Sequence, residues 1–307
     1  MASGSKMVII AALVGNLLIS VTKFVAATIT GSAAMMSEGI HSLVDTGNQI
    51  LLLYGLKRAA LPADEDFPFG YGKEIYFWSF VVAIMIFALG GGISIYQGIH
   101  HLQHPEPISN AMVNYIVLGL ALAFEGAAWY YAFREFSRVK GPWGYFEAIR
   151  RAKDPSIFVV LFEDSAAMLG LLVAFVGVLL SETTGILIFD GIASIIIGLI
   201  LIGTSIWLAY ETKGLLIGES ASQSVRRGIR DALRGRAHID HVNEILTMHM
   251  GPDFILANIS VDFDNAISAQ QVEADIAAIT RSIKQAYPQV KRVFIEAESR
   301  GNRYPPR

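Results

Sequence analysis

The sequence contains no cysteine and few charged residues. Without cysteine, the chain can form neither disulfides nor thiolate metal sites. Only 17% of the 307 residues are charged and 53% are hydrophobic, whereas an average soluble domain is about 25% charged. The net charge of −3 gives no basic surface for a nucleic acid. These values predict an integral membrane protein that contacts lipid and does not bind nucleic acid.

Motifs for nucleotide binding and hydrolysis are also missing. The sequence has no GxxxxGK[ST] phosphate-binding loop. It also lacks the HExxH and GxSxG motifs of metalloproteases and serine hydrolases. We therefore expect no bound nucleotide, no organic cofactor and no enzyme activity.

Long apolar segments are abundant. A membrane-spanning helix needs about 20 mostly apolar residues, and six segments meet this requirement. They are Met7–Thr30, Ala33–Leu56, Ile75–Ile99, Ile108–Phe133, Ile157–Leu180 and Ile186–Tyr210. The first follows the polar start MASGSK and is too long for a signal-peptide core, so we expect it to be retained.

Basic residues alternate between the connecting segments. The segments TGSA, HLQHPEPISN and SETTG contain no Lys or Arg. The opposite side holds Lys6, Lys57, Arg58, Lys73, Arg134, Arg138, Lys140, Arg150, Arg151, Lys153 and Lys213. The positive-inside rule then predicts that both termini are cytoplasmic. A bacterial inner membrane is the expected location, with an organelle as the alternative, and the basic, aromatic loop over residues 134–156 is expected to lie on the anionic leaflet.

The residues after Glu211 differ in character, because apolar runs shorten and charge rises. We expect a membrane domain over residues 1–212 and a cytoplasmic domain over 213–307. Two helices are predicted in the cytoplasmic domain: one over ESASQSVRRGIRDALRG, which has helical spacing, and one over SAQQVEADIAAITRSIKQAY, which begins with a Ser cap. Alternating side chains predict two strands, HVNEILTMHMG and FILANISVDFD, joined by a turn at Gly251–Pro252. A last strand is predicted over VKRVFIEAES. The predicted fold class is an all-α membrane domain with six helices, followed by a small α+β domain of order αββαβ.

Eight ionisable residues fall inside the predicted membrane segments. They are Lys23, Glu38, His41, Asp45, Glu125, Glu163, Asp164 and Asp190. Such residues are rare in membrane helices and mark a functional site by default. His41 and Asp45 are one helical turn apart and share a face, and helix geometry places Asp164 at a similar depth in the fifth segment. The sequence therefore predicts a site where these three side chains meet.

The ligand that suits this site is a divalent metal. Imidazole and carboxylates without sulfur fit Zn²⁺, and also Co²⁺, Fe²⁺, Ni²⁺ and Cd²⁺, whereas an all-oxygen site would be more apt for Mn²⁺. The structural alternative is a hydrogen-bond network between the second and fifth segments. Glu163 points about 100° away from its neighbour Asp164, so we expect it to face another helix unless a π-bulge turns it inward.

Other polar groups are weaker candidates. Lys23 is expected to pair with Glu38 or Asp190, and the partner of Glu125 cannot be identified from the sequence. The outer loop also carries a histidine cluster, which we expect to be solvated and which comprises His100, His101 and His104.

The stretches TGSAAMMSEGIHSLVDTGNQ and FPFGYGKE resemble the motifs of the cation diffusion facilitator family of metal transporters. FEDSAAMLG is most similar to the subgroup that contains the ninth human zinc transporter. The resemblance covers nearly the whole chain. It implies metal ligands at His41, Asp45 and Asp164, and a cytoplasmic domain that forms a homodimer.

Two departures from the family pattern affect the expected metal sites. The earlier fifth-segment ligand of the family is replaced by Val160, so the fourth ligand would be Glu163, a water or a group from another helix. Asn243 and Glu296 stand where the cytoplasmic domain of the family often has histidines, so the resemblance does not carry those metal sites over. His238, His241 and His249 are present but lie off the pattern.

The predicted function is transport of a divalent cation, above all Zn²⁺, in exchange for protons by alternating access. The ordinary pKa of histidine, about 6.5, lets His41 change charge across a physiological proton gradient. The alternative is an intramembrane metal sensor or metal-dependent enzyme, although six segments with central charges would leave a sensor role unexplained.

Overall fold

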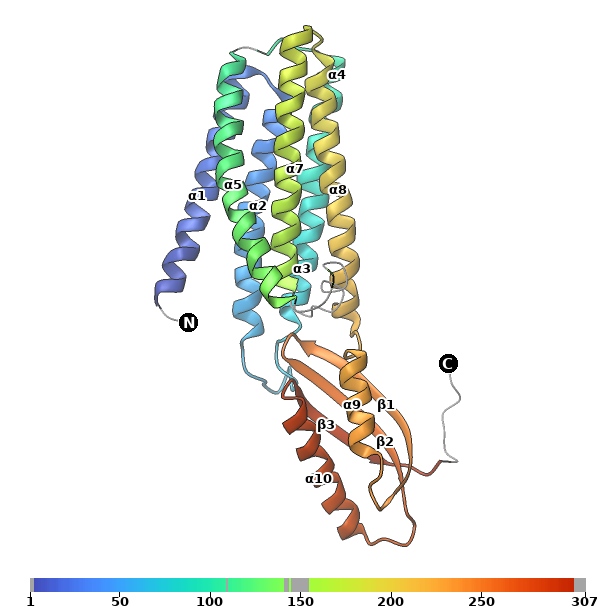
Figure 1. Ribbon diagram of the computed structural model, residues 1–307. Helices are drawn as coiled ribbons and strands as arrows, with labels where there is room; N and C mark the ends of the chain where they lie inside the picture. Colours follow the sequence, from blue (N-terminus) through green and yellow to red (C-terminus); the bar gives the residue numbers. More distant parts are fainter. Residues whose placement is uncertain (1–2, 109, 141–143, 145–154, 301–307) are drawn as a thin grey trace. The chain divides into compact units, whose positions relative to one another are not determined.

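The structure is a computed structural model that describes residues 3–108, 110–140, 144 and 155–300. The chain divides into two compact units (Figure 1). The first comprises Met1–Lys57 and Glu74–Lys213, and the second comprises Arg58–Lys73 and Gly214–Arg307. The segment Arg58–Lys73, which connects two helices of the first unit, therefore belongs to the second unit.

The described part of the first unit is built from helices that run side by side (Figure 1). They are α1 (Ser3–Thr30), α2 (Ala33–Ala59), α3 (Glu74–Met85), the π-helix η1 (Ile86–Gly92), α4 (Ile93–Gln103), α5 (Ala111–Val139), α7 (Pro155–Thr184) and α8 (Ile188–Ile217). The elements α3, η1 and α4 follow one another without a break and form the third predicted span.

Four segments of the described chain are helices long and apolar enough to cross a membrane. They are Glu74–Gln103, Ala111–Arg138, Phe158–Thr184 and Ile188–Ile217. The prediction of a mostly helical membrane unit is confirmed at this level. In α1 the apolar stretch Asn16–Thr30 is shorter, and α2 carries polar side chains along much of its length.

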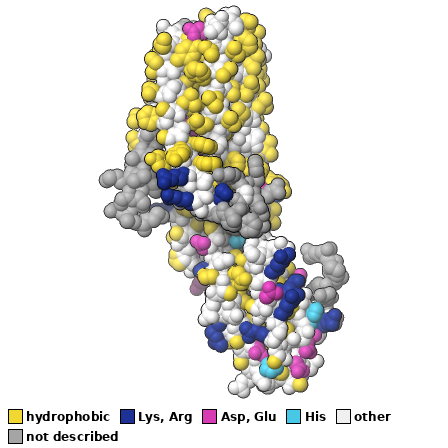
Figure 2. Space-filling view, in the orientation of Figure 1, with side chains coloured by type: hydrophobic (Ala, Val, Ile, Leu, Met, Phe, Trp, Pro, Cys, Tyr) yellow, Lys and Arg dark blue, Asp and Glu magenta, His cyan; other side chains and the backbone are white. Residues whose placement is uncertain are grey.

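The helical unit exposes large hydrophobic side chains to its surroundings. On α1 the exposed residues Val14, Leu18, Val21, Val25 and Ile29 recur every three or four positions and form one stripe. Figure 2 shows hydrophobic side chains over most of the visible face of this unit. Soluble monomers rarely expose such continuous apolar surface, so a lipid environment accounts for it.

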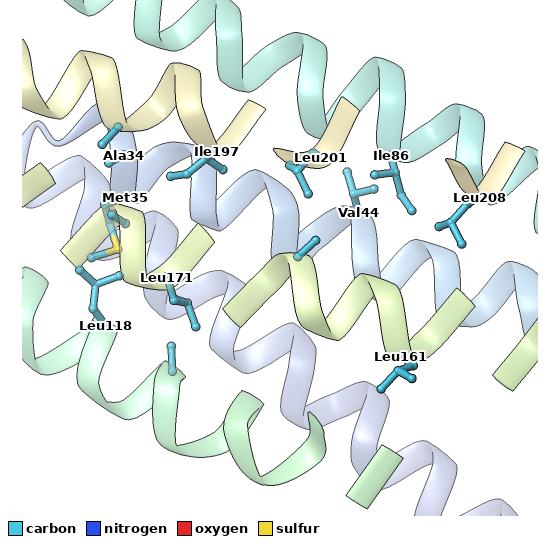
Figure 3. Packing of buried hydrophobic residues seen from close by; sticks show 14 of the residues in the cluster. Ala34, Met35, Val44, Ile86, Leu118, Leu161, Leu171, Ile197, Leu201 and Leu208 are labelled. Atoms are coloured by element: carbon cyan, nitrogen blue, oxygen red, sulfur yellow. The ribbon is translucent and has the colours of Figure 1, made fainter. Parts of the chain in front are cut away.

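Inside the unit, buried hydrophobic side chains join the helices. Met35 of α2, Leu118 of α5 and Leu171 of α7 lie close together in Figure 3 and are each fully buried. Ile197 and Leu201 bring α8 into the same cluster. This packing fixes how α2, α5 and α7 face one another, which matters because these three helices carry six of the eight ionisable residues.

Glycines bring the third span and α8 into close backbone contact. A Cβ atom at Gly98 would lie 2.7 Å from the carbonyl oxygen of Gly191, and one at Gly198 would lie 2.8 Å from that of Gly91. Small residues at helix crossings are typical of membrane proteins. The π-helix lies here in the third span, whereas α7 remains a regular α-helix through its acidic pair at residues 163 and 164.

The second unit has the predicted order αββαβ. It contains α9 (Gln223–Leu233), β1 (Ile239–Gly251), β2 (Phe254–Phe263), α10 (Ala269–Ala286) and β3 (Val290–Ala297). The sheet order is β1-β2-β3, with β1 antiparallel and β3 parallel to β2. Gly251 still pairs with Phe254, so the turn is Pro252–Asp253 rather than Gly251–Pro252.

Local signals and a core of its own explain this small domain. Ser268 and Gln271 form a capping box that begins α10. Ile229 of α9, Ile259 of β2 and Ile279 of α10 are fully buried in one cluster. Charged side chains gather on the visible face of this unit (Figure 2).

The segment Arg58–Lys73 contains the FPFGYGKE motif except for its last residue, Glu74, and folds back on itself. The Tyr71 hydroxyl donates to Asp64 Oδ2 at 2.6 Å, and the Phe67 amide donates to Asp64 Oδ1 at 2.7 Å. The hydrogen bond from Tyr71, followed by that from Phe67, lowers the pKa of Asp64. Arg58 lies over the Tyr71 ring at 5.0 Å from its centroid.

The loop predicted to lie on the membrane surface is covered only in part. Helix α5 continues to Val139, and α7 begins at Pro155. Residues 141–154, apart from Gly144, lie outside the described residues, so an interfacial helix there stays a prediction.

Candidate metal site

A cavity of about 370 Å³ lies among the helices of the first unit. Its polar lining comes from α1, α2, α5 and α7, and consists of Asn16, Ser42, Asp45, Gln49, Glu125, Glu163 and Asp164. Four carboxyl groups thus border one space inside a membrane unit. Like charges this close are unfavourable unless a cation or protons lie among them.

His41 and Asp45 meet on one face of α2, as their spacing predicts. The Nδ1 atom of His41 lies 3.3 Å from Oδ1 of Asp45. The His41 side chain is fully buried, and neither of its ring nitrogens has a hydrogen-bond partner among the described residues. Asp45 Oδ1 is also buried without one. Since buried polar groups are normally hydrogen-bonded, these atoms point to a ligand.

Glu163 of α7 faces α2. Its Oε1 accepts a hydrogen bond from the side-chain amide of Asn48, and its carboxyl group interacts directly with that of Asp45. Asn48 itself is fully buried. Asn48 follows Asp45 by three positions and His41 by seven, so its place on the same face is a signal present in the sequence.

Glu163 and Asp164 both border the cavity, which differs from the expectation that only one of them would face it. A regular helix suffices, because the cavity extends across the α7 surface from α2 to α5. Glu163 contacts α2, whereas Asp164 interacts electrostatically with Glu163 and with Glu125 of α5.

The four predicted ligands do not form a closed coordination shell. Among the described residues, no three His, Asp or Glu side chains converge as they would around a bound ion. His41 lies beside Asp45 rather than on the cavity wall. The arrangement is one in which ligands surround a space and would have to move together to enclose an ion.

Lys23 organises a second group of charges beside the cavity. Its Nζ donates to Glu125 Oε1 at 2.8 Å, Ser42 Oγ at 2.8 Å and Glu38 Oε2 at 3.1 Å. The Lys23 and Glu38 side chains are fully buried. Of the two partners expected for Lys23, Glu38 is therefore the one observed. The partner of Glu125, which the sequence did not reveal, is Lys23, 102 positions away.

Asp190 has a different environment. One of its oxygens accepts from Ser32 Oγ at 2.6 Å, and the other accepts from the backbone N–H groups of Ala33 and Ala34. Asp190 therefore caps the N-terminus of α2 from α8, which is favourable for a carboxylate. Its Oδ2 also lies 3.9 Å from His101 Nε2. We assign Asp190 a structural role.

The predicted histidine cluster is divided. His101 is buried near Asp190. His100 and His104 are exposed, one helical turn apart, with ring centroids 5.0 Å from each other. These three side chains thus do not form one group.

Comparisons with known proteins identify a family and several relatives of this chain. A family described as the cation efflux transmembrane domain matches residues 9–217. A Xenopus laevis protein named "Proton-coupled zinc antiporter SLC30A9, mitochondrial" is 33% identical over 287 residues, which is 92% of this chain and 51% of that protein. The human protein of the same name is 32% identical over 248 residues, covering 80% and 44%.

A plant relative extends the comparison. Metal tolerance protein C4 of Arabidopsis thaliana is 30% identical over 257 residues, which is 83% of this chain and 56% of that protein. The chain spans about half the length of these curated relatives. Their names are those of metal-handling proteins, and the SLC30A9 proteins are named as transporters rather than enzymes. The match of the family to more than half of the residues shows that this chain belongs to the cation efflux family, the cation diffusion facilitators.

Proposed function

We propose that this protein carries a divalent metal cation, chiefly Zn²⁺, across a membrane in exchange for protons. The observation that carries the proposal is the cavity bordered by Asp45, Glu163 and Asp164, beside which the His41 imidazole has no hydrogen-bond partner among the residues that the structure describes. Carboxylates inside a membrane are unfavourable on their own, and a divalent cation would offset their charge. The names of the SLC30A9 relatives, which specify zinc and protons, support this choice of substrate.

The proposed ligands are His41, Asp45, Glu163 and Asp164. These side chains would close around the cation from α2 and α7, and cation binding would displace protons from the imidazole and the carboxylates. Alternating access would then open the loaded cavity to the other side, where protons replace the metal. Imidazole with carboxylates also suits Co²⁺, Fe²⁺, Ni²⁺ and Cd²⁺ better than Mn²⁺.

The proposed topology has six spans with both termini in the cytoplasm, in a bacterial inner membrane. The spans are α1, α2, the continuous α3–η1–α4, α5, α7 and α8. Helices α1 and α2 have 28 and 27 residues, and at 1.5 Å per residue each exceeds the roughly 30 Å of a bilayer core. The domain over residues 213–307 is proposed to dimerise the transporter.

Transport in proteoliposomes tests the proposal. Purified protein is reconstituted with a zinc-sensitive dye trapped inside, and Zn²⁺ influx is followed with and without an imposed pH gradient. We expect saturable influx that accelerates when the lumen is acidic. Absence of flux in either direction would refute the transporter, and tight binding without flux would favour the metal-sensing alternative.

A substitution of His41 tests the coupling to protons. His41→Ala should slow transport and flatten its dependence on pH, because a titrating ligand is lost. A slower variant that keeps the wild-type pH profile would show that the carboxylates alone carry the protons.

A further inference from the structure

We infer that Glu125 of α5 supplies an additional oxygen to the cation in the cavity, and that Lys23 of α1 is the positioning residue that holds Glu125 in place. The inference deepens the proposed function and rests on it. It adds a third helix, α5, to the cation site, which otherwise draws its ligands from α2 and α7.

The two oxygens of Glu125 are in different situations. Oε1 accepts a hydrogen bond from Lys23 Nζ at 2.8 Å. Oε2 is buried and has no hydrogen-bond partner among the described residues. Since Glu125 borders the cavity, the free oxygen is available to a ligand there while the other oxygen is held.

Glu125 also lies close enough to the proposed ligands to act with them. Its carboxyl group interacts electrostatically with Asp45 on α2 and with Asp164 on α7. It therefore lies within electrostatic reach of proposed ligands on both of the helices that supply them. His41 beside Asp45 is also fully buried, and its ring nitrogens have no hydrogen-bond partner within the described part of the chain. The unsatisfied groups on α2 and α5 are therefore connected through Asp45, which interacts with both.

Lys23 is suited to positioning Glu125 because it cannot move freely. A buried ammonium group needs partners for its charge, and all three of its donors are engaged by Glu125, Ser42 and Glu38. Glu38 compensates the lysine charge from α2. The charge of Glu125 is then available to the cation, because one carboxylate is enough to pair with one ammonium.

Glu38 provides a matched control, since it bonds to the same lysine with the same chemistry. It does not border the cavity. Its other oxygen lies against Gly170 of α7, where an added Cβ would collide with it. Glu38→Gln therefore disturbs the lysine network without removing a group from the cavity.

The experiment compares Glu125→Gln with Glu38→Gln in the detergent-purified full-length chain. Zn²⁺ affinity is measured by calorimetry, and the ligand set is monitored through the visible absorption spectrum of bound Co²⁺. We expect Glu125→Gln to weaken Zn²⁺ binding by at least about 10-fold and to change the Co²⁺ spectrum. Glu38→Gln leaves both Glu125 oxygens at the cavity, so it should lose clearly less affinity than Glu125→Gln and should keep the spectrum.

Variants of Lys23 test the positioning role. Lys23→Met should weaken binding by about 10- to 100-fold, as is typical for groups that orient a ligand, and Lys23→Arg should restore part of it. In the Glu125→Gln background, Lys23→Met should cause no further loss, because both changes remove the same interaction.

Three results would overturn the inference. Wild-type affinity and an unchanged Co²⁺ spectrum in Glu125→Gln would show that Glu125 does not contact the cation. Equal losses of Zn²⁺ affinity in Glu125→Gln and Glu38→Gln would show that the lysine network supports only the fold. If Glu125→Gln does not yield monodisperse protein, Glu125→Asp serves instead, and wild-type affinity in that shortened carboxylate would also refute the contact. Wild-type protein that neither binds nor transports Zn²⁺ would refute the proposed function itself.

Discussion

Replacement of Asn48 by alanine isolates the group that orients Glu163. Asn48 is fully buried on α2 and donates its side-chain amide hydrogen to Glu163 Oε1. Asn48→Ala leaves the Glu163 carboxylate in place but removes the donor that fixes its direction. We expect this variant to fold, to bind Zn²⁺ weakly and to transport it slowly.

The size of the effect follows from the charge of the acceptor. A hydrogen bond to an ionised group contributes about 1.5–3 kcal/mol, and about 1.4 kcal/mol corresponds to a tenfold change in affinity. If the bond contributes fully to the cation-bound geometry, Zn²⁺ affinity should fall by roughly 10- to 100-fold, which is also the usual effect of removing a partner of a metal ligand.

Asn114→Ala is the matched control. Asn114 is a second fully buried asparagine, on α5, and it accepts a hydrogen bond from Thr30 Oγ1 at 2.9 Å. It does not border the cavity. Removing the Asn114 side chain should lower the free energy of unfolding by about 1 kcal/mol, measured as a lower thermal unfolding midpoint of the detergent-solubilised protein. The Zn²⁺ affinity should stay unchanged.

Calorimetric titration with Zn²⁺ and initial rates of dye-detected influx give the two readouts. Wild-type affinity in a folded Asn48→Ala protein would show that Glu163 is not held as a ligand. Equal losses of affinity in both asparagine variants would show that the effect comes from helix packing rather than from the site.

Further predictions concern the fifth span, the cytoplasmic domain and the loop. Asp164→Asn should abolish Zn²⁺ binding and flux, whereas Glu163→Gln should leave weaker but measurable binding. If calorimetry shows an equal loss of Zn²⁺ binding in both variants, Glu163 is a ligand equivalent to Asp164. A fragment from about Glu219 onward should be a dimer in chelator by light scattering, and a monomer that dimerises only with zinc would contradict this. Because the pKa of Asp64 is lowered, the structure of its loop should be fully present above about pH 3.9, the ordinary aspartate value, and lost as the pH falls through the lower folded value. Tyr71→Phe should shift that loss to higher pH, measured by limited proteolysis with pepsin, and an unchanged profile would show that the hydrogen bond does not order the loop.

Local patterns predict much of this fold. The apolar segments and the αββαβ order follow from periodicity and capping residues, because both act over a few residues. The π-helix Ile86–Gly92 does not follow from such patterns. It lies where Gly91 packs against α8, and such packing between distant segments leaves no periodic signal. The same holds for Arg58–Lys73, which joins the second unit.

In the candidate site, too, some contacts could be predicted from the sequence and others could not. His41 and Asp45 could be paired from the sequence because their four-residue spacing fixes a shared face. The direction of Glu163 could not, because it depends on how α7 is rotated against α2 and α5. The bond between Lys23 and Glu125 joins residues 102 positions apart, and opposite charges in two membrane segments are compatible with several pairings.

Charge balance explains why one cavity should bind both metal and protons. The pairing of Lys23 with Glu38 leaves Asp45, Glu125, Glu163 and Asp164 as four carboxyl groups around about 370 Å³. One divalent cation offsets two of these charges, so a loaded cavity still favours protons on the remaining groups, and an empty cavity favours more of them. Exchange of protons for metal is then the arrangement that keeps buried charge low in both states. A variant that removes one carboxylate, such as Glu125→Gln, still has three carboxyl groups, so one divalent cation should again displace about two protons, measured by calorimetry in buffers of different ionisation enthalpy. A proton count that falls when this one carboxylate is removed would refute this account of the coupling.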